Sequence, residues 1–539
     1  MKIMTGGTEV AQTLSLPRRD SSRRLSGREH RTRHECRVGR HECLRHLLPV
    51  VLISIAAFAQ APNTSYRVEN VPLPRGIAPE VASVTFSADG QLAVCFRRGY
   101  LYLMNTKTQR WTRFAEGFQS PLGIMAGAKA GEFYVAHLPE LTHVVDTDGD
   151  GKADLYETIS DQWGLSGNYH EFLYGHVRDK EGNFFLSLGL SSNGGEPRMP
   201  VRGEITTKGR KAKETREGIV GGVGHYSPTQ YRGCAIKISP AGETSLVSCG
   251  FRQPNGLGFN EAGDLFATDN QGDWVGTSPL HHVTPGAFHG HPAALNWAPW
   301  FGGRDPVEAS VEELDKLRKL PAIQFPQNDM GGSVSQPLLD TTQGAFGPYS
   351  GQMLVAEWTY PRILRADLEK VQGEYQGAAF ILVEGNGLRA GNNRIALSPD
   401  GKSLYTAQTS RIWGTSEGLQ RIVYSGKTPM DILHMRLAAD GFELEFTKPV
   451  DAATAKDPNN YSFTHYYYKY HQIYGSPKTD VTPAKVLAAE VSADGRKVRL
   501  KMENLVPRRV YELRPANLKG RDGDPLCTVE AAYTLNRLK

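Results

Sequence analysis

The chain of 539 residues lacks several features that define broad classes of protein. It contains no Cys-x-x-Cys-His motif, which excludes covalent attachment of a c-type haem. Residues 1–45 hold eleven Lys/Arg and only five Asp/Glu, so the rest of the chain carries a net charge of −1. The body of the chain therefore has too little basic charge to favour binding of nucleic acid.

Long apolar runs are also scarce. The run at residues 47–58 (LLPVVLISIAAF) is shorter than the about 20 residues that a membrane-spanning helix needs. It follows a basic stretch and ends within Ala57-Phe58-Ala59, a small-x-small cleavage pattern. We therefore expect residues 1–59 to be a leader with a signal peptide, and the mature chain to be periplasmic or extracellular with no membrane span. Because the basic stretch is long, we expect the natural start to lie downstream, with Val38 as a candidate.

One sequence pattern recurs six times between residues 66 and 426: an apolar strand, a turn ending in Gly, and a second apolar strand. The glycines that close these turns are Gly90, Gly131, Gly182, Gly263, Gly351 and Gly401. A strand–turn–strand unit with a shortest spacing of about 40–50 residues is typical of propeller blades. The sequence predicts an all-β fold, with a six-bladed β-propeller at residues 60–427.

The remainder, residues 428–539, has its own short alternating strands and predicts a small Ig-like β-sandwich. Its tyrosine-rich segment, residues 461–474, is either a carbohydrate or partner surface or packing against the neighbouring domain, and packing is favoured. The convincing helical pattern is confined to residues 307–320, and residues 201–219 read as a polar flexible loop.

Four cysteines lie outside the leader, and two of them flank a hairpin. Cys234 and Cys249 bracket CAIKISPAGETSLVSC, whose turn lies midway between them. Directly opposed strand positions are compatible with a disulfide in an oxidising compartment. The alternative is a pair of buried thiols, and the sequence leaves both open.

The sharpest motif is DTDGDGKADLYE, residues 146–157, which fits the calcium-loop pattern D-x-D-x-D-G-x5-E. A calcium ion takes six to eight oxygen ligands, which such a loop can supply. The candidate metal ligands are Asp146, Asp148, Asp150, Lys152, Asp154 and Glu157. The flanking residues read as strands, so we expect a calcium-type loop within a hairpin. The alternative is a polar turn that binds nothing.

Three further groups of residues are candidates for a catalytic or binding site. His170 lies where a loop enters a strand and could accept a proton, although a histidine satisfied by backbone groups is the more common case. Arg252 precedes a Pro-Asn-Gly turn and could bind an anion in the central funnel or brace neighbouring blades. Paired histidines at 281–291 suggest a transition metal, but their Gly/Pro setting favours a structural loop.

These residues resemble the glucose/sorbosone dehydrogenase family, soluble six-bladed propellers that use pyrroloquinoline quinone and calcium. The resemblance lies in GFRQPNGLGF (residues 250–259), ATDNQGDW (267–274) and HVTPGAFHGHP (282–292). It is closer to variant propellers of secreted environmental bacterial proteins, without their cytochrome c module. Two departures are Gln253, where the family has Asn, and FHGHP, where the family has NYGWP.

The resemblance implies roles for several residues. His170 is similar to the family's general base, and Arg252 and Asn255 are similar to its cofactor-binding residues. Arg362 and Arg365 are candidates for the remaining cofactor-contacting cations.

Three functions follow as hypotheses. The first is a quinone-dependent oxidoreductase acting on a sugar or sugar aldehyde and passing electrons to a separate acceptor. The second is a non-enzymatic propeller that binds glycan or protein through Trp297, Trp300 and the tyrosine-rich segment. The third is a calcium-dependent, lactonase-like hydrolase, which would need acidic and amide ligands in the central channel.

Overall fold

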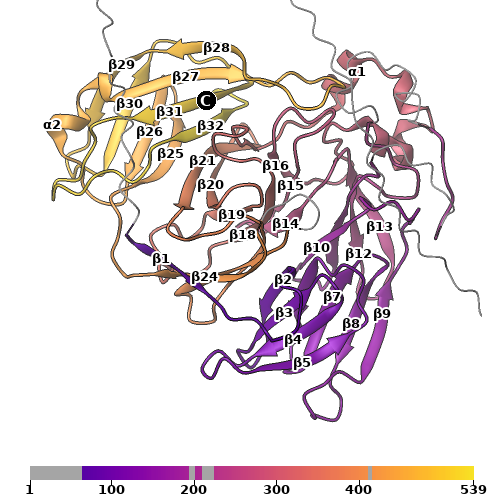
Figure 1. Cartoon of the computed structure of the whole chain (residues 1–539). Helices are drawn as coiled ribbons and strands as arrows, with labels where there is room; N and C mark the ends of the chain where they lie inside the picture. Colours follow the sequence, from indigo (N-terminus) through magenta and orange to yellow (C-terminus); the bar gives the residue numbers. More distant parts are fainter. Residues whose placement is uncertain (1–63, 193–200, 209–223, 411–415) are drawn as a thin grey trace, which may run out of the picture. The chain divides into compact units, whose positions relative to one another are not determined.

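The computed structural model describes residues 64–192, 201–208, 224–410 and 416–539 (Figure 1). These residues are mostly β-strands in many four-stranded antiparallel sheets, an arrangement consistent with an all-β propeller. The leader expected at residues 1–59, and much of the polar loop expected at 201–219, lie outside the described residues. Within the described ranges, no helix combines the length and apolar character needed to cross a bilayer.

Successive groups of four strands form the sheets of residues 66–424. The first two sheets contain β2 (Val81–Phe86), β3 (Leu92–Phe96), β4 (Tyr100–Met104) and β5 (Trp111–Glu116), then β6 (Gly123–Ala126), β7 (Glu132–His137), β8 (Glu140–Val145) and β9 (Leu155–Ser160). The next two contain β10 (Leu173–Arg178), β11 (Phe184–Leu188), β12 (Cys234–Ile238) and β13 (Thr244–Cys249), then β14 (Gly256–Phe259), β15 (Leu265–Thr268), β16 (Pro279–His282) and β17 (Ile323–Gln324).

The following strands are β18 (Val334–Leu339), β19 (Met353–Glu357), β20 (Arg362–Val371) and β21 (Glu374–Glu384). The last sheet contains β22 (Asn392–Leu397), β23 (Ser403–Gln408) and β24 (Gly418–Tyr424), and β1 (Tyr66–Asn70) completes it by pairing with β24. The N-terminal strand therefore closes a sheet whose other strands lie more than 300 residues away in the sequence.

All six predicted strand–turn–strand patterns are present in the structure. Each predicted glycine lies between the first and second strands of a sheet and has a positive φ, from 69° at Gly401 to 89° at Gly182. A residue with a Cβ is disfavoured in this left-handed region, which explains why glycine recurs there. The short-range pattern thus identified the first hairpin of each sheet.

The first strands of the sheets neighbour one another in sequence order. β2 contacts β6, β6 contacts β10, β10 contacts β14, β14 contacts β18, and β18 contacts β22. The series returns to its start because β22 also contacts β2. The first strands of the six sheets therefore form a closed series of neighbours.

Residues 432–535 form two further groups of strands (yellow in Figure 1). One is the sheet of β25 (Ile432–Ala438), β26 (Gly441–Phe446), β30 (Lys497–Met502) and β29 (Val486–Val491). The other has the order β32 (Ala531–Leu535), β31 (Arg509–Pro515), β27 (Tyr461–Tyr467) and β28 (Thr479–Ala484). Both contribute to one core, in which Phe442 packs against Phe463, Tyr511 and Tyr533.

The second of these groups is continuous with the sheet of β18–β21. Gly377 to Phe380 of β21 pair with Ala531 to Thr534 of β32, which creates a single eight-stranded sheet. Residues on either side of the expected domain boundary near residue 427 therefore share backbone hydrogen bonds.

Helical structure is sparse, as the sequence predicts. The expected helix at 307–320 is shorter and forms α1 (Val311–Leu317), because Ser310 caps it by accepting from the Glu313 amide at 3.1 Å. Among the described residues the other helical elements are α2 (Ala452–Ala455) and the 3-10 turns η2 (Pro292–Trp297), η3 (Pro299–Phe301), η4 (Pro306–Glu308) and η5 (Pro458–Asn460).

Cys234 and Cys249 are directly opposed in the β12–β13 ladder, as the hairpin pattern predicts. The structure contains them as two free, buried thiols rather than as a disulfide. Burial raises the pKa of the Cys249 thiol to about 12, so both side chains behave as apolar core residues at neutral pH.

Arg365 is fully buried where β20 meets the C-terminal strands. Its guanidinium donates to the Ile432 carbonyl and, at 3.2 Å, to the Leu433 carbonyl, lies 3.5 Å from Asp431, and stacks over the ring of Phe380 at 3.8 Å. The structure therefore places Arg365 at the junction rather than in a cofactor site. Arg362, the other candidate, is paired with Glu384 on the neighbouring strand.

We predict that Arg365→Met lowers the free energy of unfolding by about 3–5 kcal/mol, because it leaves the buried Asp431 carboxylate without its cation. Arg362→Met, three residues earlier on the same strand, removes a partly exposed pair with Glu384 and two bonds to the carbonyls of Asp329 and Met330, and should cost less, about 1–2 kcal/mol. Urea unfolding of both variants measures the difference. Equal losses would show that Arg365 does not stabilise the junction.

Candidate functional site

A cavity of about 310 Å³ lies at one end of the strands, where all six sheets of residues 66–424 contribute lining residues. Its walls come from the start of first strands, as at Leu122 and Asn255, and from the end of second strands, as at Asn270 and Trp358. The C-terminal region adds Tyr474. This is the size expected for a small-molecule site.

The lining of this cavity has a distinctive chemistry. Among the described residues that form it, none is a carboxylate, and the charged ones are Arg97 and Arg252. Side-chain amides are abundant: Gln253, Asn255, Asn270, Gln271, Gln327, Asn328 and Asn393. Aromatic rings are supplied by Phe172, Tyr174, Trp358 and Tyr474. Amides and rings suit a ligand rich in hydroxyl groups, and the arginines suit a ligand that carries carboxylates.

The structure brings His170, Arg252 and Asn255, three residues that the sequence singles out, into this one cavity. His170 is 8% exposed, and its Nδ1 accepts a hydrogen bond of 2.8 Å from Gln253 Nε2. The amide orientation is defined, because Nε2 also donates to the Leu190 carbonyl while Oε1 accepts from the Tyr174 hydroxyl. In the neutral ring the proton of His170 is therefore on Nε2.

The loop that carries His170 is held from beneath by buried charged groups. Arg232 is fully buried and donates to the carbonyls of Gly164, Glu171 and Phe172. The Glu171 carboxylate accepts from the Ser166 amide at 2.7 Å and from the Ser166 hydroxyl at 2.6 Å. These bonds fix the entry to β10, and with it the position of the imidazole.

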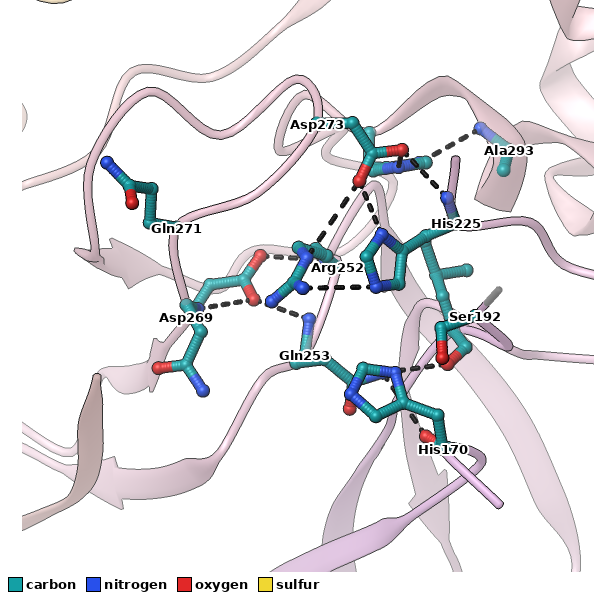
Figure 2. A network of polar contacts seen from close by, with 12 residues as sticks. His170, Ser192, His225, Arg252, Gln253, Asp269, Gln271, Asp273 and Ala293 are labelled. Carbon is teal, nitrogen blue, oxygen red and sulfur yellow. Dashed lines mark hydrogen bonds and ion pairs between the residues drawn. The ribbon is translucent and has the colours of Figure 1, made fainter. Parts of the chain in front are cut away.

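Arg252 belongs to a buried network with two histidines and one carboxylate (Figure 2). Its Nη2 donates to His225 Nε2 at 3.0 Å, and His225 Nδ1 donates to Asp273 Oδ1 at 2.5 Å. His291 Nε2 donates to the second oxygen of Asp273 at 3.1 Å, while its Nδ1 accepts from the Ala293 amide. Arg252 Nε also lies 3.9 Å from Asp273 Oδ1, so Arg252 and Asp273 form a buried ion pair that His225 bridges.

Burial dominates the titration of this network. It lowers the pKa of His225 to about 4, with the Arg252 charge acting in the same direction. Burial alone would raise the pKa of Asp273, but His225 and His291 outweigh it and hold that pKa well below its usual range. At neutral pH the Asp273 charge therefore offsets the charge of Arg252.

A second buried carboxylate orients the backbone that precedes β14. Asp269 accepts from the amides of Arg252 at 2.8 Å, Gln253 at 2.7 Å and Asn270 at 2.8 Å (Figure 2). Burial nevertheless raises the pKa of Asp269 to about 6. Asp269 thus fixes the chain direction that turns Arg252 and Gln253 toward the cavity.

Two glycines make room for these side chains. A Cβ on Gly272 would lie 2.0 Å from Arg252 Nε, and a Cβ on Gly189 would lie 2.1 Å from Gln253 Oε1. A residue with a Cβ at either position would therefore have to displace the Arg252 or the Gln253 side chain from the place it occupies here.

Arg394, which sequence reasoning missed, contacts two residues that line the cavity. It is 2% exposed, lies on β22, and donates to the Leu122 carbonyl at 2.7 Å and to the Asn255 carbonyl at 2.9 Å, so it bridges three sheets. Its described hydrogen-bond partners contain no carboxylate, and burial lowers its pKa to about 10. The sequence holds no local motif for it: Arg394 directly follows Asn393, the counterpart of Asn255 in the sixth strand–turn–strand pattern, at the position that Gly256 occupies in the fourth.

The predicted calcium loop forms the β8–β9 turn, so its flanks are strands as expected. The carboxylates of Asp146, Asp148 and Asp150 lie within 4.8 Å of one another. Asp154 instead accepts from the Thr147 amide at 2.8 Å, and Glu157 faces His143 at 3.5 Å. Calcium binding by this loop, with Lys152 as a carbonyl ligand, stays a prediction.

The loop and the cavity lie at opposite ends of their sheet. β6 begins at the cavity, where Leu122 precedes it, and β7 and β8 alternate in direction after it. The β8–β9 turn is therefore at the far end.

The remaining candidates lie outside the cavity. Trp297 donates through Nε1 to Ser227 Oγ at 2.7 Å, and Trp300 is 45% exposed beside Phe301. His281 and His289 are buried with their ring centroids 4.8 Å apart, next to Phe251. The only cluster of three or more potential metal ligands within the described part of the chain is that of Asp146, Asp148 and Asp150.

No family model matches this chain, and no curated protein matches it. Among solved structures it is similar to a putative oxidoreductase (glucose dehydrogenase) from Thermus thermophilus, at 17% identity and a TM-score of 0.46 over 66% of this chain and 100% of that one. It is also similar to the PQQ-bound aldose sugar dehydrogenase of Streptomyces coelicolor (15% identity, TM-score 0.43, 67% and 99%). A third is the holo pyranose dehydrogenase PQQ domain of Coprinopsis cinerea, at 11% identity and a TM-score of 0.46 over 68% of this chain and 97% of that one.

We predict that the protein loses stability as the pH falls from about 6.5 to 4. The unfolded chain protonates His225 near its ordinary pKa, whereas the folded chain does so only near 4, so the unfolded state binds more protons in this window. His225→Asn keeps a donor for Asp273 but does not titrate. Between pH 7 and pH 5 the variant should lose about 2 kcal/mol less than the parent in urea unfolding. An unchanged pH dependence would contradict the assignment.

Proposed function

We propose that residues 60–427 form a six-bladed β-propeller, that residues 428–539 form an Ig-like β-sandwich, and that the cavity oxidises a sugar or sugar aldehyde with a bound quinone. The observation that supports this function best is the lining of the cavity. It combines two arginines, many amides and four aromatic rings without a described carboxylate. The closed order of first strands supports the six-bladed arrangement.

The residues present fit a planar, carboxylate-bearing quinone such as pyrroloquinoline quinone. The Nε of Arg252 is buried without a hydrogen-bond partner within the described structure. Arg252 and Arg97 would hold carboxylates of the cofactor, Asn255 would bind its polar edge, and Trp358 or Tyr174 would cover its plane. Arg394, buried below without a described carboxylate partner, adds positive potential at the floor of the cavity.

When bound, the quinone supplies two-electron acceptance from the substrate carbon, and a separate acceptor then reoxidises it. The protein's part is to bind the sugar hydroxyls through side-chain amides, to exclude water, and to take up the hydroxyl proton. We propose that His170 is the base that accepts this proton from the substrate hydroxyl. Because Gln253 donates to Nδ1, the ring proton of His170 is on Nε2. His170 would become a base at Nε2 only if that proton moved to Nδ1 and the Gln253 amide turned, which breaks its 2.7 Å bond to the Leu190 carbonyl.

A non-enzymatic glycan-binding propeller is the alternative that the same cavity supports, since its amides and rings would bind a sugar without any cofactor. The lactonase-like alternative receives less support. A calcium ion in the channel would need carboxylate ligands, and none of the described lining residues provides one.

We also propose that calcium binds the Asp146–Glu157 loop in a structural role and that the chain is exported. The three clustered carboxylates repel one another without a cation. Their place at the far end of the second sheet separates the ion from the chemistry. Export is supported by the basic and apolar pattern of residues 1–59.

We predict that pyrroloquinoline quinone binds the mature protein stoichiometrically in calcium buffer and supports dye reduction with a panel of sugars. Arg252→Ala and Arg97→Ala should each weaken quinone binding about 10-fold or more, because each removes a charge-assisted contact. His170→Ala should keep the quinone bound and abolish turnover. Absorbance titration, calorimetry and dye reduction provide the readouts.

Arg98→Ala is the matched control, because Arg98 pairs with Glu80 as Arg97 does but does not line the cavity. Its quinone affinity should equal that of the parent. Absence of quinone binding would refute the oxidoreductase and leave the glycan-binding alternative. Undiminished turnover in His170→Ala would refute the role of His170.

We predict that calcium raises the free energy of unfolding by about 2.7 kcal/mol at a concentration 100 times the dissociation constant. Asp148→Asn should abolish this gain, since it removes one of the three clustered carboxylates. Glu157→Gln reports separately whether the strand residue joins the site. Thermal unfolding in calcium and in chelator measures the effect, and identical curves would exclude the ion.

A further inference from the structure

A segment of the C-terminal region, residues 468–477, lies across the loops that line the cavity. The Gly475 and Ser476 amides donate to the carbonyls of Gly272 and Gly276 at 2.8 and 2.9 Å. The Tyr470 hydroxyl donates to the Gly290 carbonyl at 2.6 Å, and Arg318 lies over the Tyr470 ring at 4.4 Å. These contacts hold the segment against residues 272–290, as the sequence predicts in favouring packing for this tyrosine-rich stretch.

Tyr474 differs from its packed neighbours because its side chain remains open at the rim. Its backbone pairs with Asp273, the carboxylate of the buried network. Its ring is 48% exposed, lines the cavity, and has the Arg252 guanidinium over it at 5.2 Å. A tyrosine ring held in one orientation at a cavity mouth is an apolar surface with a polar edge.

A second hollow, of about 700 Å³, continues from this rim across the segment. It shares Gln271 and Tyr474 with the cavity, and its other lining residues include Lys469, His471, Gln472 and Ile473. Like the cavity, it has no carboxylate among its described lining residues. Ile473, which is 41% exposed, adds a second apolar contact next to Tyr474.

We propose that this second hollow is a saccharide subsite, and that the substrate is an oligosaccharide whose terminal ring enters the cavity while the next ring stacks on Tyr474. The inference rests on the proposed function for the class of substrate, a sugar, and adds that this sugar has more than one unit. A sugar ring presents axial hydrogens to an aromatic face and hydroxyls to amides, and both partners are at the junction of the two hollows. A monosaccharide held in the cavity alone would leave the exposed Tyr474 and Ile473 side chains in water.

Isothermal calorimetry on the quinone-free protein tests this inference without relying on turnover. The probes are the cello- and malto-oligosaccharide series of one to four units. For the parent protein we expect at least one series to bind about 5- to 10-fold more tightly when the second ring is added, the gain typical of a single aromatic contact. Tyr474→Ala should lose that increment, so that its affinities for the one-unit and two-unit saccharides become equal.

Tyr474→Phe keeps the ring and should keep the increment, whereas Tyr474→Leu keeps only apolar bulk and should lose most of it. Tyr156→Ala is the matched control, because Tyr156 is 45% exposed on β9 and lines neither hollow. Affinity that does not depend on chain length, or an increment that survives in Tyr474→Ala, would overturn the inference, as would failure of every probe to bind. Quinone titration decides the proposed function separately, since it needs no saccharide.

Discussion

The buried guanidinium of Arg394 is the interaction on which the arrangement of the site depends. A cation in the interior is tolerated only when its donors find acceptors, and this one finds them on the chain entering β6 and the chain entering β14. Those segments precede first strands and carry cavity residues. The geometry of the cavity floor is therefore tied to the need to satisfy a single side chain, and Asn255 is fixed both by Arg394 and by its own bond of 3.1 Å to Ser335.

The walls of the cavity depend on a second compensated charge. Arg252 is neutralised by Asp273 through His225, so its guanidinium stays near the cavity without a free charge of its own. The two buried arginines thus differ, since Arg394 keeps its charge uncompensated while that of Arg252 is balanced. The positive charge that no described carboxylate balances therefore lies at Arg394, beside the chain that carries Asn255.

Sequence alone predicted the elements that depend on neighbouring residues. The six turn glycines, the Cys234–Cys249 register and the strands around Asp146–Glu157 follow from short-range patterns, and the structure contains them. His170, Arg252 and Asn255 were identified because turns and strand entries are visible in sequence. The partners of these residues were not identified, since His225 and Arg394 come from distant segments and have no local motif. Tyr474 belongs to the tyrosine-rich segment that the sequence singles out, but its place at the cavity was not predicted. Arg365 was instead assigned to the wrong place. The sequence around an arginine on a strand does not distinguish a side chain that faces a ligand from one that is buried at a domain junction.

The continuous sheet formed by β21 and β32 has a consequence for how the chain can be divided. β21 spans eleven residues, and its outer side is hydrogen-bonded to the C-terminal region through Gly377–Phe380. Removing residues 428–539 would leave that edge as a row of unpaired amides and carbonyls beside Ala378 and Phe380, a template for strand addition by another chain. The C-terminal region thus acts as a cap against self-association, so truncation at the apparent domain boundary would yield aggregates rather than an isolated propeller.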